Sequence, residues 1–322
     1  MSIFEPRTNF KPFEYPELVG YKNAINHSYW LVSEWNFTSD INDYHTKLNH
    51  VERHVIKNAL LAISQIEVSV KKFWTKLGET FPKAEFDQVG VTFGESEIRH
   101  ADAYSHLLQV LGLNDDFATL LDNPVIKGRV EYLSKYLTRG ATQQEFVFTL
   151  ALFSLFVENV SLFSQFAVIK SFNKHKNVLK DIDNVVQATQ KEELIHAQFG
   201  SYLVRLIQKE HPEWFTPQFY ERLNEAVVKA FDAECAILDW IFEKGEPEFL
   251  TKASLVAFLK QRFNDSLVMI GAEPYFSVTR DDLNGLTWFD DEIHAEVNVD
   301  FFHKKPVSYS KKTQAIKAED IF

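Results

Sequence analysis

Proline and glycine are scarce in this sequence of 322 residues, with 10 and 11 copies. No proline occurs between Pro16 and Pro82, or between Pro124 and Pro212. Because proline removes a backbone donor and breaks helices, such stretches favour long helices. No alternation of apolar and polar residues is long enough to predict a strand, and no repeat of solenoid length is present. The sequence therefore predicts an all-α protein.

Cysteine and dense positive charge are also lacking. The single cysteine, Cys235, cannot form an internal disulfide, and no secretory signal opens the sequence, so we expect a cytoplasmic protein. The formal net charge is −11, which argues against nucleic acid as a partner. The sequence has no Gly-rich phosphate loop and no Gly-x-Gly-x-x-Gly motif, so we expect no nucleotide in a site of its own.

One apolar run, residues 146–169, is long enough to tempt a membrane interpretation. Glu158 lies in its middle, with Asn159 and Gln165 close by. A charge at the centre of a bilayer is expensive, so we interpret the run as a helix buried in a soluble core and expect no membrane contact. The hydrophobic share of 45% and the 29 Phe residues are enough to build such a core.

We expect three parts along the chain: an aromatic N-terminal arm over residues 1–38, a helical domain over 39–290, and a flexible C-terminal tail over 291–322. Ser39 and Asp40 are expected to cap the first long helix. Beyond residue 271 the helical periodicity fades. The spacing of apolar residues predicts seven helices, over about residues 39–77, 83–110, 117–137, 142–172, 177–210, 217–243 and 247–270.

Four of these helices carry glutamate on an apolar stripe. Glu67 follows Ile63 by one turn in the first, and Glu158 is the only charged residue between Glu145 and Lys170 in the fourth. The second and fifth helices each place Glu-x-x-His in phase with apolar residues. Their stripes read Phe93, Glu97, His100, Tyr104, Leu107 and Leu111 in the second helix, and Val186, Thr189, Glu193, His196 and Leu203 in the fifth.

This inventory predicts a metal site. A buried carboxylate without a partner is expensive, so four of them with two histidines call for a cation, and oxygen-rich ligation with two imidazoles suits iron or manganese. Helix bundles that hold two metals use one Glu from each of two helices and Glu-x-x-His from each of the other two. A single Glu-x-x-His is weak support, and metal-free core ion pairs are the alternative. The predicted ligands are Glu67, Glu97, His100, Glu158, Glu193 and His196.

The segments GESEIRHADAYSHLL and ATQKEELIHAQFG, with FVENVSLF between them, resemble the radical-generating beta subunit of class I ribonucleotide reductase. The resemblance covers most of the chain and assigns the same six ligands. It implies a ferritin-like fold and a homodimer. It also implies that this homodimer delivers an oxidising equivalent to a separate catalytic alpha subunit. There a cysteine thiyl radical would begin the reduction of ribonucleotides to deoxyribonucleotides.

The resemblance implies further roles. Tyr104, four residues beyond the first ligand histidine, is at the position of the stable tyrosyl radical in many members. Trp30 matches the tryptophan of the radical-transfer path, with Trp35 as an alternative, and Glu192 matches its acidic partner. Tyr309 matches the tail tyrosine that relays the radical, and the terminal AEDIF matches the peptide that docks on alpha.

Spacing separates the two adjacent glutamates of KEELIHAQFG. The earlier copy, ESEIRH, has Glu97 three residues before His100 and Ser96 in the preceding position. Only the three-residue spacing is shared, so Glu193 should bind metal. Glu192 is then left to orient His100 or Trp30 from outside the ligand set.

Two departures from the family pattern bear on the metal. The first ligand is commonly aspartate, but here it is Glu67. Lys71 follows one turn later, where its charge would disfavour oxidation of Tyr104. Together these features resemble the subclass with a dimanganese, Mn(IV)/Mn(III) cofactor that is formed with superoxide and without a tyrosyl radical. The alternative is a di-iron centre with a tyrosyl radical. The manganese/iron subclass often has Phe at the position of Tyr104. The sequence leaves open whether an activating flavoprotein is needed.

Two other functions fit the same ligands. A ligand-binding dimetal oxidase or monooxygenase of ferritin-like fold would use Glu158, Leu162 and Phe166 as a tunnel wall, but it would leave Trp30 and the tail without a role. Ferritin-like metal storage is the non-catalytic alternative, although storage proteins of this fold are generally much shorter.

Overall fold

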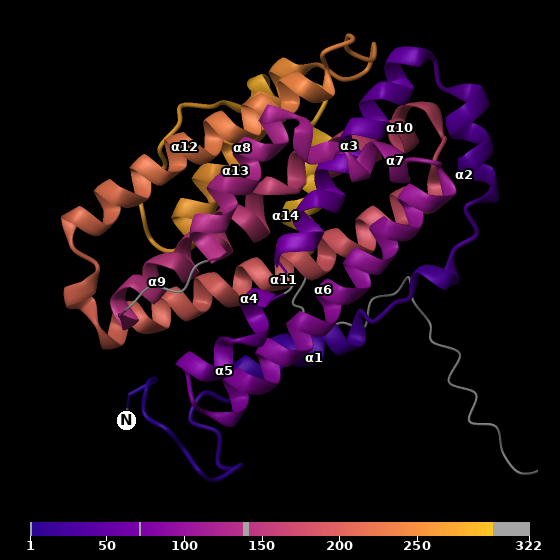
Figure 1. The fold of residues 1–322 in the computed structure, drawn as a ribbon. Coiled ribbons are helices and arrows are strands. Elements are labelled where there is room, and N and C mark those ends of the chain that lie inside the picture. Colours follow the sequence, from indigo (N-terminus) through magenta and orange to yellow (C-terminus); the bar gives the residue numbers. More distant parts are fainter. Residues whose placement is uncertain (1, 71, 138–141, 299–322) are drawn as a thin grey trace, which may run out of the picture.

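The computed structural model describes residues 2–70, 72–137 and 142–298. Within these residues every regular element is a helix and no strand occurs, which confirms the all-α prediction. Four long helical segments form the core, and Figure 1 shows two of them, α6 and α11, running side by side. The core segments are α3 (His50–Val70), α6 (Ala84–Val110), α11 (Lys180–Glu210), and the continuous run of α9 (Gln143–Leu152), η4 (Phe153–Ser161) and α10 (Phe163–Lys176).

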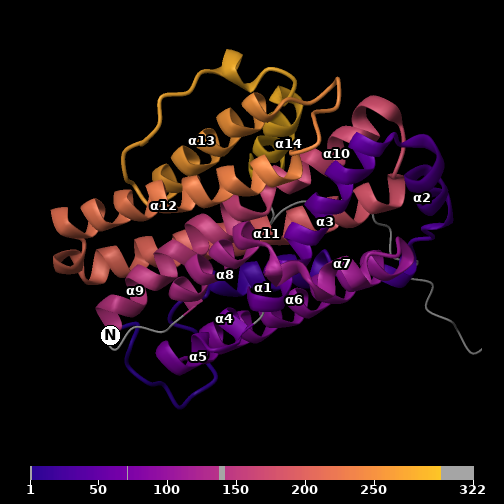
Figure 2. The same cartoon turned by 45° about the horizontal axis from the view of Figure 1, so that its top comes forward.

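The four core segments form a closed ring. Helix α6 packs on α3 and α11, and α10 packs on the other sides of α3 and α11. Helix α1 covers one face of this ring, and helices α12 and α13 cover the opposite face (Figures 1 and 2). The remaining helices are α1 (Leu18–His27), η1 (Val32–Glu34), α2 (Thr38–Asn42), η2 (Asp43–Lys47), α4 (Lys72–Thr75), α5 (Leu77–Thr80), α7 (Asn114–Ala118), η3 (Leu120–Asp122), α8 (Pro124–Leu137), η5 (Pro212–Trp214), α12 (Pro217–Ile241), α13 (Lys252–Met269), η6 (Arg280–Leu283) and α14 (Thr287–Asn298).

The apolar run is a core helix, as expected from its central glutamate. A helix over Gln143–Lys176 is long and apolar enough to cross a membrane, but 94% of its most apolar 18-residue window is buried inside the protein. It begins with a capping box, in which the Thr142 hydroxyl accepts from the Glu145 N–H at 3.2 Å. The run therefore fills the centre of the molecule.

The middle of this run, η4, is wound as a π-helix. Two of its carbonyls accept hydrogen bonds from side chains of α13. The Ser266 hydroxyl donates to the Leu155 carbonyl at 2.9 Å, and Arg262 Nε donates to the Asn159 carbonyl at 3.0 Å. Ser266 also accepts from the Asn159 side chain at 2.7 Å. Helix α13 thus fixes the side of η4 that faces away from α11.

The prediction of one continuous helix over residues 39–77 is wrong. Among the described residues this span is interrupted twice, between the end of η2 at Lys47 and the start of α3 at His50, and between the end of α4 at Thr75 and the start of α5 at Leu77. Asp40 is not the cap of its own helix, because its carboxylate accepts from the Ile182 backbone N–H at 2.7 Å in the first turn of α11. Helix α3 has its own capping box instead, formed by Asn49 and Glu52 at 2.9 and 3.0 Å. The side chain that local sequence assigns to an N-cap is therefore bound to another helix.

Three further boundaries differ from expectation. The third predicted helix is broken before Pro124, which occupies the first position of α8. The seventh begins at Lys252 rather than 247, where the Thr251 hydroxyl accepts from the Ser254 N–H at 3.2 Å. Helix α14 was not predicted, and it continues to Asn298, past residue 291 where the tail was expected to begin.

Candidate metal centre

The core ring brings all six predicted ligands together. Each side chain is at most 2% exposed. Glu67 comes from α3, Glu97 and His100 from α6, Glu158 from η4, and Glu193 and His196 from α11. Ligand atoms fall into two groups, each within 4.8 Å, that share Glu97: Glu67, Glu97 and His100 in one, and Glu97, Glu158, Glu193 and His196 in the other.

Two carboxylates lie between the two imidazoles. Glu97 Oε1 is 3.2 Å from His196 Nδ1, and Glu97 Oε2 is 3.9 Å from His100 Nδ1. Glu193 has the same arrangement in reverse, with Oε1 3.0 Å from His100 Nδ1 and Oε2 3.4 Å from His196 Nδ1. A carboxylate with one oxygen toward each histidine is placed to bridge two metals. Glu97 and Glu193 therefore fit the bridging positions, and Glu67 and Glu158 the outer ones.

The hydrogen bonds on the outer side of each imidazole fix which nitrogen faces the cluster. His100 Nε2 lies 2.8 Å from Glu192 Oε2, and a carboxylate can only accept, so Nε2 carries the proton. His196 Nε2 lies 3.0 Å from the Ser96 hydroxyl, which already donates its proton to the Phe93 carbonyl at 2.7 Å. In both rings Nδ1 is therefore the nitrogen that faces the carboxylates, and it could bind a metal once any proton on it is released.

The carboxylate oxygens and imidazole nitrogens that face one another in this cluster are better suited to bind a metal than to hydrogen-bond one another. Both oxygens of Glu67 and of Glu97, Glu193 Oε2, and Nδ1 of both histidines are buried without a hydrogen-bond partner. Buried polar groups in native proteins are nearly always paired, and several lone pairs converging on one space are paired by a cation. The donor set, four carboxylates and two imidazoles, suits two iron or manganese ions.

The electrostatics of the six residues point the same way. Burial raises the pKa of Glu67 and of Glu158 well above the ordinary value, and the neighbouring carboxylates raise both further. Burial opposes ionisation of His100 as well, but Glu192 and Glu193 raise the pKa of this imidazole above its usual range. Without metal the cluster must hold protons to offset its negative charge, so metal binding releases protons.

Helix α4 contributes a residue that the sequence did not single out as functional. Trp74 follows Glu67 by seven residues on the same stripe, and its indole Nε1 donates to Glu158 Oε1 at 2.7 Å. The side chain is fully buried and packs edge-on against Phe93 and Phe199. Trp74 therefore holds one oxygen of Glu158 and leaves Oε2 facing His196 at 3.5 Å.

Close approach of α11 to η4 depends on Gly200. A Cβ atom at this position would lie 1.9 Å from the Ser154 hydroxyl oxygen, 2.4 Å from Ser154 Cβ, and 3.3 Å from the Trp74 ring. Only glycine lets these two helices meet at this distance. Gly200 lies one turn beyond His196, so the contact sets how closely the α11 ligands approach Glu158.

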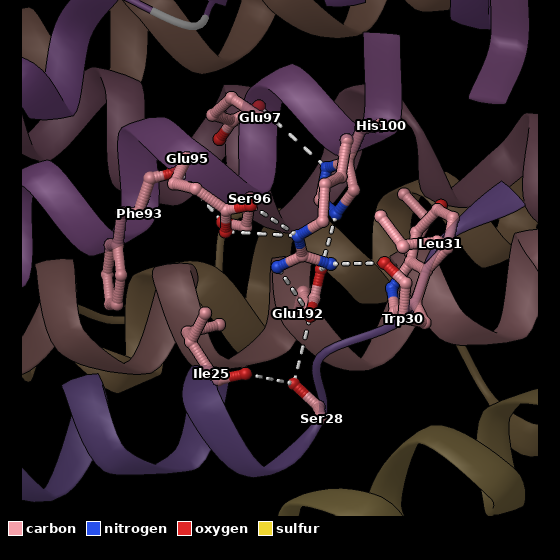
Figure 3. Close-up of polar contacts among 12 residues, drawn as sticks. Ile25, Ser28, Trp30, Leu31, Phe93, Glu95, Ser96, Glu97, His100 and Glu192 are labelled. Atoms are coloured by element: carbon pink, nitrogen blue, oxygen red, sulfur yellow. Dashed lines mark hydrogen bonds and ion pairs between the residues drawn. The ribbon is translucent and has the colours of Figure 1, made fainter. Parts of the chain in front are cut away.

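Outside the ligands, Glu192 is the centre of a second buried network (Figure 3). Its carboxylate accepts from Ser28 Oγ at 3.0 Å, from Arg99 Nη1 and Nη2 at 3.1 Å each, and from His100 Nε2 at 2.8 Å. The sequence predicted a contact with His100 or Trp30, and the structure has the former. Arg99 and Ser28 were missed, because nothing in their local sequence marks them as neighbours of α11.

Trp30 lies beside this network. Its ring stacks on His100, with centroids 5.9 Å apart and planes 15° from parallel. Trp35, the alternative, contacts Trp30 with centroids 5.3 Å apart but is not the ring stacked on the ligand. Trp30 is 3% exposed, while its neighbours Tyr29 and Leu31 are 36% and 44% exposed. The segment therefore connects a ligand histidine to the surface.

Tyr104 is fully buried on α6, one turn beyond His100. Burial raises the pKa of its hydroxyl well above the usual range, the charge of Glu67 raises it further, and the Thr189 hydroxyl opposes both. The phenol therefore keeps its proton, and its hydroxyl is buried without a hydrogen-bond partner among the described residues. Lys71 and Tyr309, also singled out in the sequence, lie outside the described residues, as do the last 24 residues of the expected tail.

Comparison with known proteins agrees with this geometry. The family described as ribonucleotide reductase, small chain, matches residues 7–284. The chain belongs to this family. It is the small subunit of a ribonucleoside-diphosphate reductase, an oxidoreductase that works with a large subunit.

Curated relatives are similar along nearly the whole chain. A probable ribonucleoside-diphosphate reductase small subunit of Invertebrate iridescent virus 3 is 26% identical, over 97% of this chain and 86% of its own length. The ribonucleoside-diphosphate reductase subunit beta of Treponema pallidum is 18% identical, over 96% of this chain and 89% of its own.

Solved structures show the same fold. A putative class I ribonucleotide reductase from Bacillus halodurans superposes with a TM-score of 0.78 at 15% identity, covering 85% of this chain and 99% of that one. The dimanganese(II)-NrdF of Streptococcus sanguinis has a TM-score of 0.70 at 18% identity, covering 87% and 97%. An R2-like ligand-binding oxidase with a Mn/Fe cofactor has a TM-score of 0.69 at 18% identity, covering 80% and 94%. These likenesses confirm the ferritin-like fold.

Proposed function

We propose that this small subunit initiates radical chemistry from a dimanganese centre held by the six buried ligands. The observation that carries the proposal is the continuity from the ligands to the surface. His100 faces the centre through Nδ1, stacks on Trp30, and hydrogen-bonds Glu192 through Nε2. When bound, the two metals supply one oxidising equivalent, and the residues of the chain conduct it.

The residues have separate roles in this proposal. Glu97 and Glu193, which each face both imidazoles, would hold both ions, while His100 and His196 would each offer Nδ1 to one ion. Glu192 holds the proton on His100 Nε2 and so keeps this ring oriented. Trp30 passes an electron inward, and the exposed segment at Tyr29 and Leu31 lies on the side from which that electron arrives.

Manganese is proposed over iron because of the residues around the first ligand. Glu67 replaces the usual aspartate, and both of its oxygens are buried without a hydrogen-bond partner. Lys71 follows it by one turn in the sequence. Among the similar structures, the one from Streptococcus sanguinis is described as dimanganese(II). Activation by superoxide, without a tyrosyl radical at Tyr104, belongs to the same proposal.

The decisive experiment combines metal analysis with EPR. Protein purified after growth with both manganese and iron should contain about two Mn per chain. Exposure to superoxide should then give the multiline signal of a coupled Mn pair. Tyr104→Phe should keep the signal and nucleotide reduction with the large subunit. Iron-loaded protein that gave a tyrosyl doublet with oxygen, and lost activity in Tyr104→Phe, would establish the di-iron alternative.

We further propose that the protein is a homodimer and that the residues from about 303 to 322, including Tyr309 and the terminal AEDIF, dock on the large subunit. Removing these residues should abolish nucleotide reduction but leave metal content and EPR unchanged. A ligand-binding oxidase would keep its full activity after the same truncation. Size-exclusion chromatography should give a dimer, whereas a cage-sized assembly would point to metal storage.

A further inference from the structure

Trp30 has a buried donor that no acceptor satisfies. Its indole Nε1 has no hydrogen-bond partner among the described residues, and the side chain is 3% exposed. Such orphaned groups are rare in folded proteins and call for an explanation. The obvious acceptor would be the Glu192 carboxylate, because both Trp30 and Glu192 contact the same imidazole of His100.

The Glu192 carboxylate already accepts from other donors. A carboxylate offers about four acceptor positions, and here three N–H donors and the Ser28 hydroxyl surround it. The single Ser28 proton is shared, because this hydroxyl also lies 3.1 Å from the Ile25 carbonyl oxygen. The Oε1 atom accepts from Ser28 and from Arg99 Nη2, and the Oε2 atom accepts from His100 and from Arg99 Nη1. Arg99 alone takes two of the four, in the forked geometry that guanidinium and carboxylate favour.

Arg99 also places positive charge beside the indole. Its Cζ atom lies 5.6 Å from the centroid of the Trp30 ring, and Nη1 is 3.5 Å from the Trp30 carbonyl oxygen. A cation near an aromatic face stabilises the neutral ring and disfavours loss of an electron from it, since the product is itself positive. In addition, Arg99 neutralises the Glu192 charge that would otherwise favour that product.

A second carboxylate is ready to receive Arg99. Glu95 lies one turn earlier on α6, and both of its oxygens are 3.0 Å from Arg99 Nε. Glu95 is at the surface, with a side chain that is 46% exposed, whereas the Arg99 side chain is 5% exposed. The guanidinium thus bridges an inner and an outer carboxylate, and rotation toward Glu95 would release Glu192 without leaving the charge unpaired.

We infer that Arg99 is a positioning residue that closes the radical path by occupying Glu192, and that its movement toward Glu95 opens it. The inference rests on the proposed function of Trp30. When the path is open, one electron leaves the indole for the oxidised metal centre, which is reduced by that electron. The Nε1 proton passes to the Glu192 carboxylate, and a neutral indole radical remains. When the path is closed, the proton has no acceptor and the product would be a radical cation beside Arg99.

The first test uses metal-free protein, so it depends on neither cofactor nor partner. Indole ¹⁵N labelling gives one N–H signal for each of the six tryptophans, and Trp30→Phe identifies the signal of Trp30. In Arg99→Lys, whose compact ammonium cannot fork across both oxygens, the Trp30 N–H signal should move downfield as it bonds to Glu192. Arg99→Gln should give the same shift. An unchanged Trp30 signal in both variants would overturn the inference and leave the proposed function intact.

The second test measures the lifetime of the oxidised centre without the large subunit. Arg99→Gln should lose its oxidised EPR signal at least about tenfold faster than wild type, because Trp30 is no longer held back. Adding Trp30→Phe should restore the wild-type lifetime. The matched control is Arg129→Gln, which breaks another buried Arg–Glu pair, with Glu234 at 3.1 Å, and should leave the lifetime unchanged. Equal lifetimes in Arg99→Gln and wild type, or an acceleration that persists in the double variant, would contradict the inference.

Discussion

Trp74 donates a hydrogen bond of 2.7 Å from its indole nitrogen to Glu158 Oε1, so a residue of α4 holds a predicted ligand carried by the π-helical segment η4. The bond leaves Glu158 Oε2 as the oxygen that faces His196. Hydrogen bonds of this kind orient metal ligands and raise affinity. The position of α4 relative to η4 therefore helps to define the metal site.

Trp74→Phe should weaken metal binding by about 10-fold to 100-fold, the usual effect of losing such a partner. The ring is kept, so the packing against Phe93 and Phe199 should change little. Metal titration followed by calorimetry measures the affinity. Trp288→Phe is the control, because that indole donates to the Gly285 carbonyl at 2.9 Å in an exposed setting. Equal affinities in Trp74→Phe and wild type would show that the bond does not orient Glu158.

Glu192→Ala and Glu193→Ala should separate two adjacent carboxylates by function. Glu193 faces both imidazoles at 3.0 and 3.4 Å, so its loss should empty at least one metal position. Among the predicted ligands Glu192 hydrogen-bonds His100, at its outer nitrogen. Glu192→Ala should therefore keep metal at saturating concentration and lose nucleotide reduction with the large subunit. Metal content by mass spectrometry and an activity assay read out the two effects. Normal metal content in Glu193→Ala would refute the bridging assignment.

The metal-free protein should become less stable as the pH rises. Burial raises the pKa of Glu67, Glu97 and Glu158 above the ordinary 4.5. Partner carboxylates raise the pKa of the two ligand histidines above 6.5 despite burial. A group with a raised folded pKa stabilises the fold below its unfolded pKa and loses that contribution as pH rises through the folded value. Among the six predicted ligands, Glu193 has its pKa shifted in the opposite direction. Burial would raise it, but hydrogen bonds from Glu158 and the two histidines lower it.

The melting temperature of metal-free protein should therefore fall by a few degrees between about pH 5 and about pH 8. Metal replaces the protons, so the gain in melting temperature on metal binding should grow over the same window. Differential scanning calorimetry with and without manganese measures both. Glu67→Gln removes one of the raised carboxyls and should flatten the metal-free slope. A metal-free melting temperature that rises with pH would contradict the assignment of protons to this cluster.

Gly200→Ala should destabilise the protein by about 1–3 kcal/mol, the usual effect of overpacking, because the new Cβ would lie 1.9 Å from Ser154 Oγ. In an open helix the same change stabilises by about 1 kcal/mol. Gly128→Ala on α8 is the matched control, since no atom lies within 4 Å of its Cβ position, and it should raise stability. Urea unfolding measures both. Ser154→Gly in the Gly200→Ala background should recover part of the loss.

The convergence of the six predicted ligands could be foreseen from the sequence because helical spacing determines which side chains share a face. The two Glu-x-x-His copies and the single glutamates, Glu67 and Glu158, needed no knowledge of how the helices pack. Their partners did. Ser96 was visible only as the residue filling the position before Glu97, and its contact with His196 100 residues away depends on how α6 meets α11.

Other features of the fold were beyond local pattern. Asp40 has the residue type of a helix cap, yet it lies inside α2 and its carboxylate accepts from the Ile182 backbone N–H in the first turn of α11, a contact that depends on how the helices pack. The π winding of η4 has no signature in a run that is apolar on nearly every side, where every helical phase looks buried. Helix α14 was missed because Asp and Glu in its first turns hide the apolar positions Phe289 and Ile293.

Two consecutive residues of η4 are held by different helices. Glu158 is held by Trp74 on the side of the metals, and Asn159, the next residue, is held by Arg262 and Ser266 of α13. One peptide bond joins Glu158 to Asn159. A displacement of α13, which lies on the outer face of the bundle, reaches the metal ligands through a single peptide bond.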